Sequence, residues 1–231
     1  MCIRDRYQTE FEGMHYELGT SGFLYRSNKV MYDHGTKSMW STLKGEPVAG
    51  PLMGKNIKLK RRYLITSTWG EWKRRHPDTT VLSLDTGHRR DYGEGVAYNK
   101  YFGTDELMFT VPELDKRLLN KDEVLAFRDE KQQLAIAIKY LARARVHHDR
   151  IGDTKIVVLA DADGTSRAYD AGDVKFASWN QNDIATDVQG RKWHVKEDKL
   201  TSGDQTLTRM PSHNVFWFGW VSQFPETRLV K

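Results

Sequence analysis

The segment YDHGTKSMW, from Tyr32 to Trp40, holds the residue types best suited to chemistry in this chain. The carboxylate of Asp33 could act as a general base or a metal ligand, with the hydroxyl groups of Thr36 and Ser38 as hydrogen-bond partners and Trp40 as an apolar wall. The same spacing also fits an Asx-type turn, in which the Asp33 side chain accepts hydrogen bonds from the following residues. Both interpretations make this segment the first candidate site.

Metal ligands are the next possibility, because His147, His148 and Asp149 are consecutive. Imidazole and carboxylate groups are acceptable ligands for zinc or iron. Neighbouring residues of a strand point to opposite faces, however, so the two histidines do not readily share one ion, and a hairpin end is favoured. The remaining histidines are scattered, and Cys2 is the only cysteine. Any metal site must therefore be assembled by the fold.

The formal net charge of +5 raises the question of nucleic-acid binding. The densest basic run, KNIKLKRRY (Lys55 to Tyr63), alternates basic residues with Ile57 and Leu59, which is the period of a strand with one solvated face. Nucleic acid is therefore not the expected partner. No run of apolar residues reaches the eighteen or so that a membrane span needs.

Two segments of the chain share a pattern of rare residues. TWGEWKRRHPDT, residues 68–79, and FWFGWVSQFPET, residues 216–227, both read W-x-x-W-x4-P-[DE]-T, with L-x-R ahead of each at the same distance. This agreement predicts an internal duplication, and it suggests an ion pair between the arginine and the acidic residue of each copy. The matching positions are Arg61, Trp69, Trp72, Pro77 and Asp78 in the first copy and Arg209, Trp217, Trp220, Pro225 and Glu226 in the second.

The elements around these segments define the expected organisation. A Thr68 cap and a proline stop predict a short helix in the first copy, and alternating apolar residues predict hairpins elsewhere. We therefore expect an α+β protein, mainly β, made of two related halves that each end in a short Trp-x-x-Trp helix and a strand. Residues 1–6 are interpreted as a non-native leader, 7–86 as an N-terminally truncated first half, 87–118 as a connector and 119–231 as the second half.

The run from Gly19 to Gly54, together with TWGEWKRRHPDT and the aromatic segment YGEGVAYNKYF, resembles a bacterial and archaeal family catalogued as domain of unknown function 3179. The resemblance covers nearly everything after Tyr7. It implies a duplicated, β-rich domain, often in proteins that are exported, and hence an extracytoplasmic location. It also marks Ser21 and Tyr25 as positions typical of the family pattern. The family's usual upstream Cys-Pro-Leu-Cys-Gly-Thr-like motif is absent here, and the resemblance supplies no catalytic residue.

Comparison of the two copies directs the search for function, because scaffold positions should keep their character in both. The part of the second copy around residues 179–187 keeps almost none of the Tyr32–Trp40 pattern. We therefore expect binding of a small ligand or metal at a polar site in the first half. One alternative is a hydrolytic or metal-dependent enzyme using Asp33 with a histidine brought in by the fold, and another is a structural or interaction module. The candidate ligand-binding residues are Ser21, Tyr25, Asp33, Thr36, Ser38 and Trp40.

Overall fold

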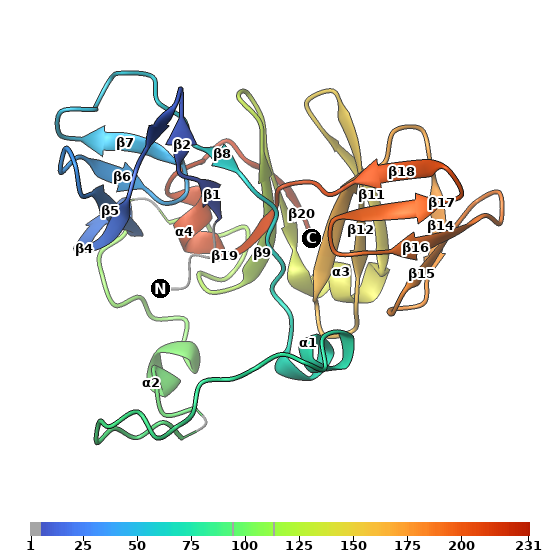
Figure 1. Ribbon diagram of the computed structural model, residues 1–231, viewed down its shortest axis with the longest axis horizontal. Helices are drawn as coiled ribbons and strands as arrows, with labels where there is room; N and C mark the ends of the chain where they lie inside the picture. Colours follow the sequence, from blue (N-terminus) through green and yellow to red (C-terminus); the bar gives the residue numbers. More distant parts are fainter. Residues whose placement is uncertain (1–5, 94, 113) are drawn as a thin grey trace.

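The computed structural model describes residues 6–93, 95–112 and 114–231, so that Cys2 and most of the predicted leader lie outside the described residues. Strands far outweigh helices in it, which confirms the mainly β, α+β class. Figure 1 shows a small sheet from the first half on one side, a larger one from the second half on the other, and further strands of the second half between them.

The first-half sheet is an antiparallel meander whose four strands pair in chain order. Its first hairpin turns through Arg26 and Ser27, both with positive φ (44° and 63°), which is the backbone of a type I′ turn. Trp40 and Leu59 belong to the buried cluster beneath it. The strands are β4 (Leu18–Tyr25), β5 (Asn28–Asp33), β6 (Met39–Ser41) and β7 (Glu46–Ala49), with the small pairs β1 (Tyr7–Gln8) and β8 (Lys60–Arg61), and β2 (Glu10–Phe11) and β3 (Met14–His15), beside them.

The second half contains a meander of the same kind with five strands. Along one of them Trp193 and Val195 are buried while Lys192 and His194 are exposed, the alternation of a sheet with one solvated face. The strands are β14 (Phe176–Trp179), β15 (Ile184–Asp187), β16 (Lys192–Val195), β17 (Lys199–Ser202) and β18 (Gln205–Thr208).

The remaining strands of the second half form two sheets that carry the main core. One has the order β19-β9-β10-β20, in which β20 runs parallel to β10, and the other has the order β11-β12-β13. The helix α3 (Ile138–Ala144) connects β10 of the first of these sheets to β11 of the second. The strands are β9 (Glu123–Arg128), β10 (Gln133–Ala137), β11 (Val146–Ile151), β12 (Thr154–Ala160), β13 (Ser166–Asp170), β19 (His213–Phe216) and β20 (Arg228–Val230).

Each Trp-x-x-Trp segment forms a helix, and each helix lies against the other half (Figure 1). In α1 (Trp69–Arg75) the Thr68 hydroxyl accepts from the amide of Glu71, as predicted for the helix cap. Glu71 then contacts Arg167 of β13. Conversely, α4 (Trp217–Val221) contacts the first-half hairpin, where Asn28 Nδ2 donates to the carbonyl of Gly219 over 2.7 Å. A third short helix, α2 (Asn99–Phe102), lies in the connector.

The two helical segments differ in their burial and in the conformation of the chain after each helix. Trp217 is completely buried, whereas Trp69 is 52% exposed. The predicted strand after the helix is present in the second half as β20 but not in the first, where residues 79–86 form no strand. The physical reason is pairing: β20 hydrogen-bonds to β10, and no described strand of the first half occupies the corresponding place.

Candidate functional site

Asp33 lies at the end of β5 with both carboxylate oxygens engaged. Its Oδ1 accepts from the Thr36 amide at 2.6 Å, and its Oδ2 accepts from the Thr36 hydroxyl at 2.7 Å and from Trp40 Nε1 at 3.1 Å. Burial alone would raise the pKa of Asp33, but the hydrogen bonds from Thr36 and Trp40 outweigh it and hold the pKa below its usual range. The carboxylate is therefore ionised, buried and occupied by its own turn.

Ser38 extends this network to the next loop of the first half. Its hydroxyl lies 2.7 Å from that of Thr36 and accepts from the amide of Leu52 at 3.0 Å. The Leu52 side chain is buried against Trp40 in the same cluster. The Asp33 network thus fixes the position of the loop that comes after β7.

The second half repeats the central contact of this network. Trp193 Nε1 donates to Asp187 Oδ2 at 3.0 Å, and the amides of Gln189 and Arg191 donate to Asp187 Oδ1. Asp187 thus contacts an indole as Asp33 does, although residues 179–187 keep almost none of the Tyr32–Trp40 sequence pattern. The turn is one residue shorter there, with six positions from carboxylate to indole instead of seven, so the match appears only when a gap is allowed.

The other two candidates of the first half lie apart from Asp33. The Ser21 hydroxyl donates to the carbonyl of Val30 at 2.5 Å and accepts from the amide of Phe23, inside an irregular stretch of the β4–β5 pairing. Tyr25, at the end of β4, is half-buried and lines a pocket. The structure therefore brings Asp33, Thr36, Ser38 and Trp40 together but not all six residues.

The pocket at Tyr25 has a volume of about 290 Å³ and is built from three parts of the first half: the end of β4, the β6–β7 turn with β7, and the loop before β8. Lys44 and Glu46 form an ion pair there at 3.6 Å. Lys58 is exposed, and no described carboxylate pairs with it. The pocket therefore has an excess of positive charge. Its walls are Tyr25, Lys44, Glu46, Pro47, Val48, Met53, Gly54, Asn56, Ile57 and Lys58.

Side chains of the second half hold the backbone of this pocket. Gln223, just after α4, donates from Nε2 to the carbonyl of Tyr25 at 3.0 Å. Arg128 at the end of β9 donates to the carbonyl of Lys44 at 2.6 Å. These bonds make the pocket walls part of the contact between the halves, and sequence patterns did not reveal them because they join residues far apart in the chain.

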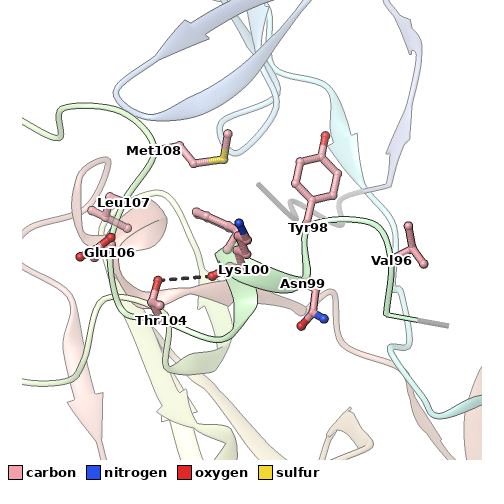
Figure 2. Close-up of a pocket in the computed structure, with 9 residues that line it drawn as sticks. Val96, Tyr98, Asn99, Lys100, Thr104, Glu106, Leu107 and Met108 are labelled. Atoms are coloured by element: carbon pink, nitrogen blue, oxygen red, sulfur yellow. Dashed lines mark hydrogen bonds between the residues drawn. The ribbon is translucent and has the colours of Figure 1, made fainter. Parts of the chain in front are cut away.

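A larger pocket of about 650 Å³ lies in the connector (Figure 2). Figure 2 shows Tyr98 and Met108 on either side of Lys100. All its wall residues come from positions 96–108, and Lys121 ties this segment to the second half by donating to the carbonyls of Tyr101 and Thr104. Two aromatic residues of the connector, Tyr98 and Tyr101, thus line a pocket made from one segment.

A charged cluster that sequence reasoning missed lies where α1 meets the second half. Buried Arg167 contacts Glu71 at 2.7 Å and Glu197 at 3.3 Å, and Asp161 lies 3.9 Å away. Burial raises the pKa of Asp161, and the attraction of Arg167 only partly offsets this. The signal available was Glu71 on a helix otherwise basic in its last turn, but its partners come from distant strands.

His76 and Phe224, which align in the two copies, have equivalent packing. The His76 ring lies 4.1 Å from the Trp72 ring between centroids, and the Phe224 ring lies 4.5 Å from that of Trp220. His76 Nε2 also lies 3.8 Å from Glu197 Oε1. The exchange of phenylalanine for histidine therefore keeps an aromatic contact and adds a polar one.

The arginines of the duplicated pattern have partners other than those predicted. Buried Arg209 donates to the Tyr169 hydroxyl and to the carbonyls of Glu197 and Ser166, while Glu226 is exposed. The predicted ion pair between Arg209 and Glu226 is thus wrong, because the buried guanidinium of Arg209 donates instead to this hydroxyl and these two carbonyls. Arg61 donates to the carbonyl of Arg128, and both Asp78 and Pro77 are exposed.

Two further features bear on function. Among the described residues no group of three or more His, Cys, Asp or Glu side chains is placed to hold a metal ion. His147 Nε2 lies 3.2 Å from Asp149, whereas His148 contacts the backbone of Phe176, so the two rings face different partners as the strand geometry predicted. Within the described residues, no helix is long and apolar enough to cross a membrane.

The comparisons with known proteins give one match. The family model described as "Protein of unknown function (DUF3179)" matches residues 4–227, nearly the whole chain. No curated protein and no solved structure matches this chain. The segments that carried the sequence resemblance, including the Asp33–Trp40 turn and both Trp-x-x-Trp helices, all lie within the matched range. The chain therefore belongs to the DUF3179 family.

Proposed function

We propose that the first half of this chain binds a small organic anion in the pocket at Tyr25. The observation that carries the proposal is the combination of two lysines, Lys44 and Lys58, with apolar walls in one concave site. Glu46 neutralises one positive charge, and the other is left for a ligand. Sites for small molecules typically combine apolar walls with a few convergent polar groups. A carboxylate with an aliphatic or aromatic part has this chemistry.

In this proposal the Asp33 network positions the pocket and does not touch the ligand. Ser38 holds Leu52 in place, and Leu52 precedes Met53 and Gly54, which form part of the pocket wall. The enzyme alternative requires Asp33 itself to contact the substrate. A general base needs a carboxylate oxygen within reach of the substrate proton, and both oxygens of Asp33 already accept hydrogen bonds within the turn.

The proposal is tested by titrating ¹⁵N-labelled protein with acetate, benzoate, succinate and citrate while following the amides of residues 44–58. We expect saturable shifts confined to this region for the anions with an apolar part. Lys58→Met should weaken binding by about fivefold, because an exposed ion pair contributes on the order of 1 kcal/mol. Lys60→Met is the matched control, because Lys60 is also exposed but lies outside the pocket wall. Equal effects of both variants, or no saturable shifts, would overturn the proposal.

We also propose that the two halves descend from one duplicated unit. Both meanders pair in chain order and carry an aspartate that accepts from a buried indole. Both helices are followed by a threonine whose hydroxyl accepts from the second tryptophan, at 3.0 Å in Trp72–Thr79 and 3.0 Å in Trp220–Thr227. Matching side-chain contacts at matching positions support common descent over chance.

A further inference from the structure

A hydrogen-bonded chain of three side chains joins α3 to β11 in the second half. The Tyr140 hydroxyl lies 3.1 Å from His147 Nδ1, and His147 Nε2 lies 3.2 Å from Asp149 Oδ2. These side chains belong neither to the pocket at Tyr25 nor to the Asp33 network. A hydroxyl, an imidazole and a carboxylate within hydrogen-bonding reach in this order form the arrangement by which enzymes activate a nucleophile.

The fold holds the imidazole of this chain from two sides. His147 and Asp149 are two residues apart on β11, so both side chains point to the same face of the strand. His148 lies between them and points to the other face, where it contacts the backbone of Phe176. The ring of Tyr140, on α3, packs edge-on against the His147 ring at 5.3 Å between centroids. The orientation of His147 is therefore set by the same two residues that it hydrogen-bonds.

The charge on Asp149 decides which atom carries each proton. Arg228 of β20 donates to both oxygens of this carboxylate, at 2.6 Å and 3.0 Å, and the amide of Arg150 donates at 2.7 Å. Burial alone would raise the pKa of Asp149, but these hydrogen bonds outweigh it and lower the pKa. The ionised carboxylate can only accept, so His147 Nε2 carries the proton between them. In the neutral ring Nδ1 is then left to accept from the Tyr140 hydroxyl.

A cation lies close to this hydroxyl along the helix. Arg143 comes one turn after Tyr140 on α3, so the two side chains share a face of the helix. Arg143 is exposed, and no described carboxylate pairs with it. A guanidinium in this place can stabilise the negative charge that develops on the oxygen of a substrate attacked at Tyr140.

We propose that Tyr140 is the nucleophile of a Tyr140–His147–Asp149 triad that accepts the acyl group of small aryl or enol esters. The phenolic oxygen of Tyr140 bonds to the ester carbonyl carbon while the hydroxyl proton moves to His147 Nδ1, and Asp149 stabilises the imidazolium. The bond from this carbon to the leaving oxygen then breaks, and that oxygen takes the proton from His147. The products are acylated Tyr140 and a free phenol or enol. A phenol displaces only leaving groups of similar acidity, which restricts the substrates to these two kinds of ester.

The first test treats the unaltered chain with 4-nitrophenyl acetate at neutral pH and locates stable acetyl groups by peptide mass spectrometry. Tyr140 should be acetylated at least ~10-fold faster than Tyr98, which is 62% exposed and hydrogen-bonds to no described histidine. Exposure alone predicts the opposite order, because Tyr140 is half-buried. Acetylation of Tyr98 at an equal or higher rate would overturn the proposal. This comparison needs no variant, so it holds even where a variant fails to fold.

The second test replaces the proposed base, with His148→Gln as the matched control because the ring of His148 faces the other side of β11. His147→Gln should slow acetylation of Tyr140 by about 100-fold, as for the loss of a general base, and His148→Gln should change the rate by less than about twofold. Asp149→Asn should slow acetylation by at least ~10-fold, since an amide no longer fixes the tautomer of the imidazole. Equal effects of the two histidine variants, or an unchanged rate in His147→Gln, contradict the inference. Anion titration at the pocket is a separate readout, so the failure of either proposal can be recognised.

Discussion

Replacing Asp33 by alanine tests the Asp33 network most directly. The substitution removes the acceptor of three hydrogen bonds, two from Thr36 and one from Trp40. Thr36 is half-buried and its donors can turn to water, whereas Trp40 is 1% exposed and its indole N–H cannot. The cost should therefore come mainly from the indole.

The magnitude follows from these environments. Leaving a buried donor without an acceptor costs about 1–3 kcal/mol, and the loss of hydrogen bonds to a charged acceptor adds to this cost. We expect Asp33→Ala to lower the free energy of unfolding by about 3 kcal/mol near neutral pH. The effect should shrink in acid. The pKa of Asp33 is lowered in the folded chain, so its stabilisation is present above the unfolded pKa of about 4 and is lost as the pH falls through the folded pKa.

Urea unfolding followed by circular dichroism measures this loss, and a double-mutant cycle with Trp40→Phe assigns it. In the Trp40→Phe background the Asp33→Ala change should cost less by about 1–2 kcal/mol, because the orphaned donor is gone. Asp187→Ala is the matched variant, since Asp187 has the same contact with Trp193. A loss below about 0.5 kcal/mol for Asp33→Ala, or an undiminished loss in the Trp40→Phe background, would refute the reasoning.

Three further outcomes are expected. Burial lowers the pKa of His213 to about 3, helped by two nearby arginines, so stability should fall by about 2.5 kcal/mol from pH 7 to pH 4.5, and His213→Gln should remove this slope in acid unfolding curves. Arg167→Met should cost about 3 kcal/mol in urea unfolding, because it removes a buried cation shared by Glu71, Glu197 and Asp161 and leaves buried Glu71 with Arg75, and Glu71→Gln in the Arg167→Met background should recover part of the loss. Trp220→Phe should destabilise by about 2 kcal/mol in thermal unfolding, and Trp72→Phe by less than about 1 kcal/mol, because only Trp220 is completely buried.

The local parts of the fold could be predicted from sequence because their determinants lie within a few residues. The Thr68 cap, the end of α1 before Pro77 and the helical Trp-x-x-Trp segments all depend on neighbours in the chain. The strand expected after α1 is a different case. Its apolar residues have strand character, but a strand needs a hydrogen-bonding partner, and none of the described strands supplies one. Its absence reflects pairing, which no local pattern encodes.

The candidate site was only partly predictable for a similar reason. The grouping of Asp33 with Thr36, Ser38 and Trp40 follows from turn geometry and could be anticipated. The Tyr25 pocket could not, because its walls combine segments whose approach is set by contacts from β9 and from the chain after α4. When the two copies are compared without a gap, Asp33 has no counterpart in the second copy. Asp187 nevertheless accepts a hydrogen bond from an indole as Asp33 does.

The features in which the copies differ lie instead on the two helices. At corresponding positions α1 has Glu71 and Arg75 where α4 and the residues after it have Gly219 and Gln223. Both helices meet the first hairpin of the opposite meander, but α4 is buried along its whole length, whereas Glu71 is the one buried residue of α1. A helix held mainly by buried charge depends on its ion pairs, because removing one partner leaves the other uncompensated.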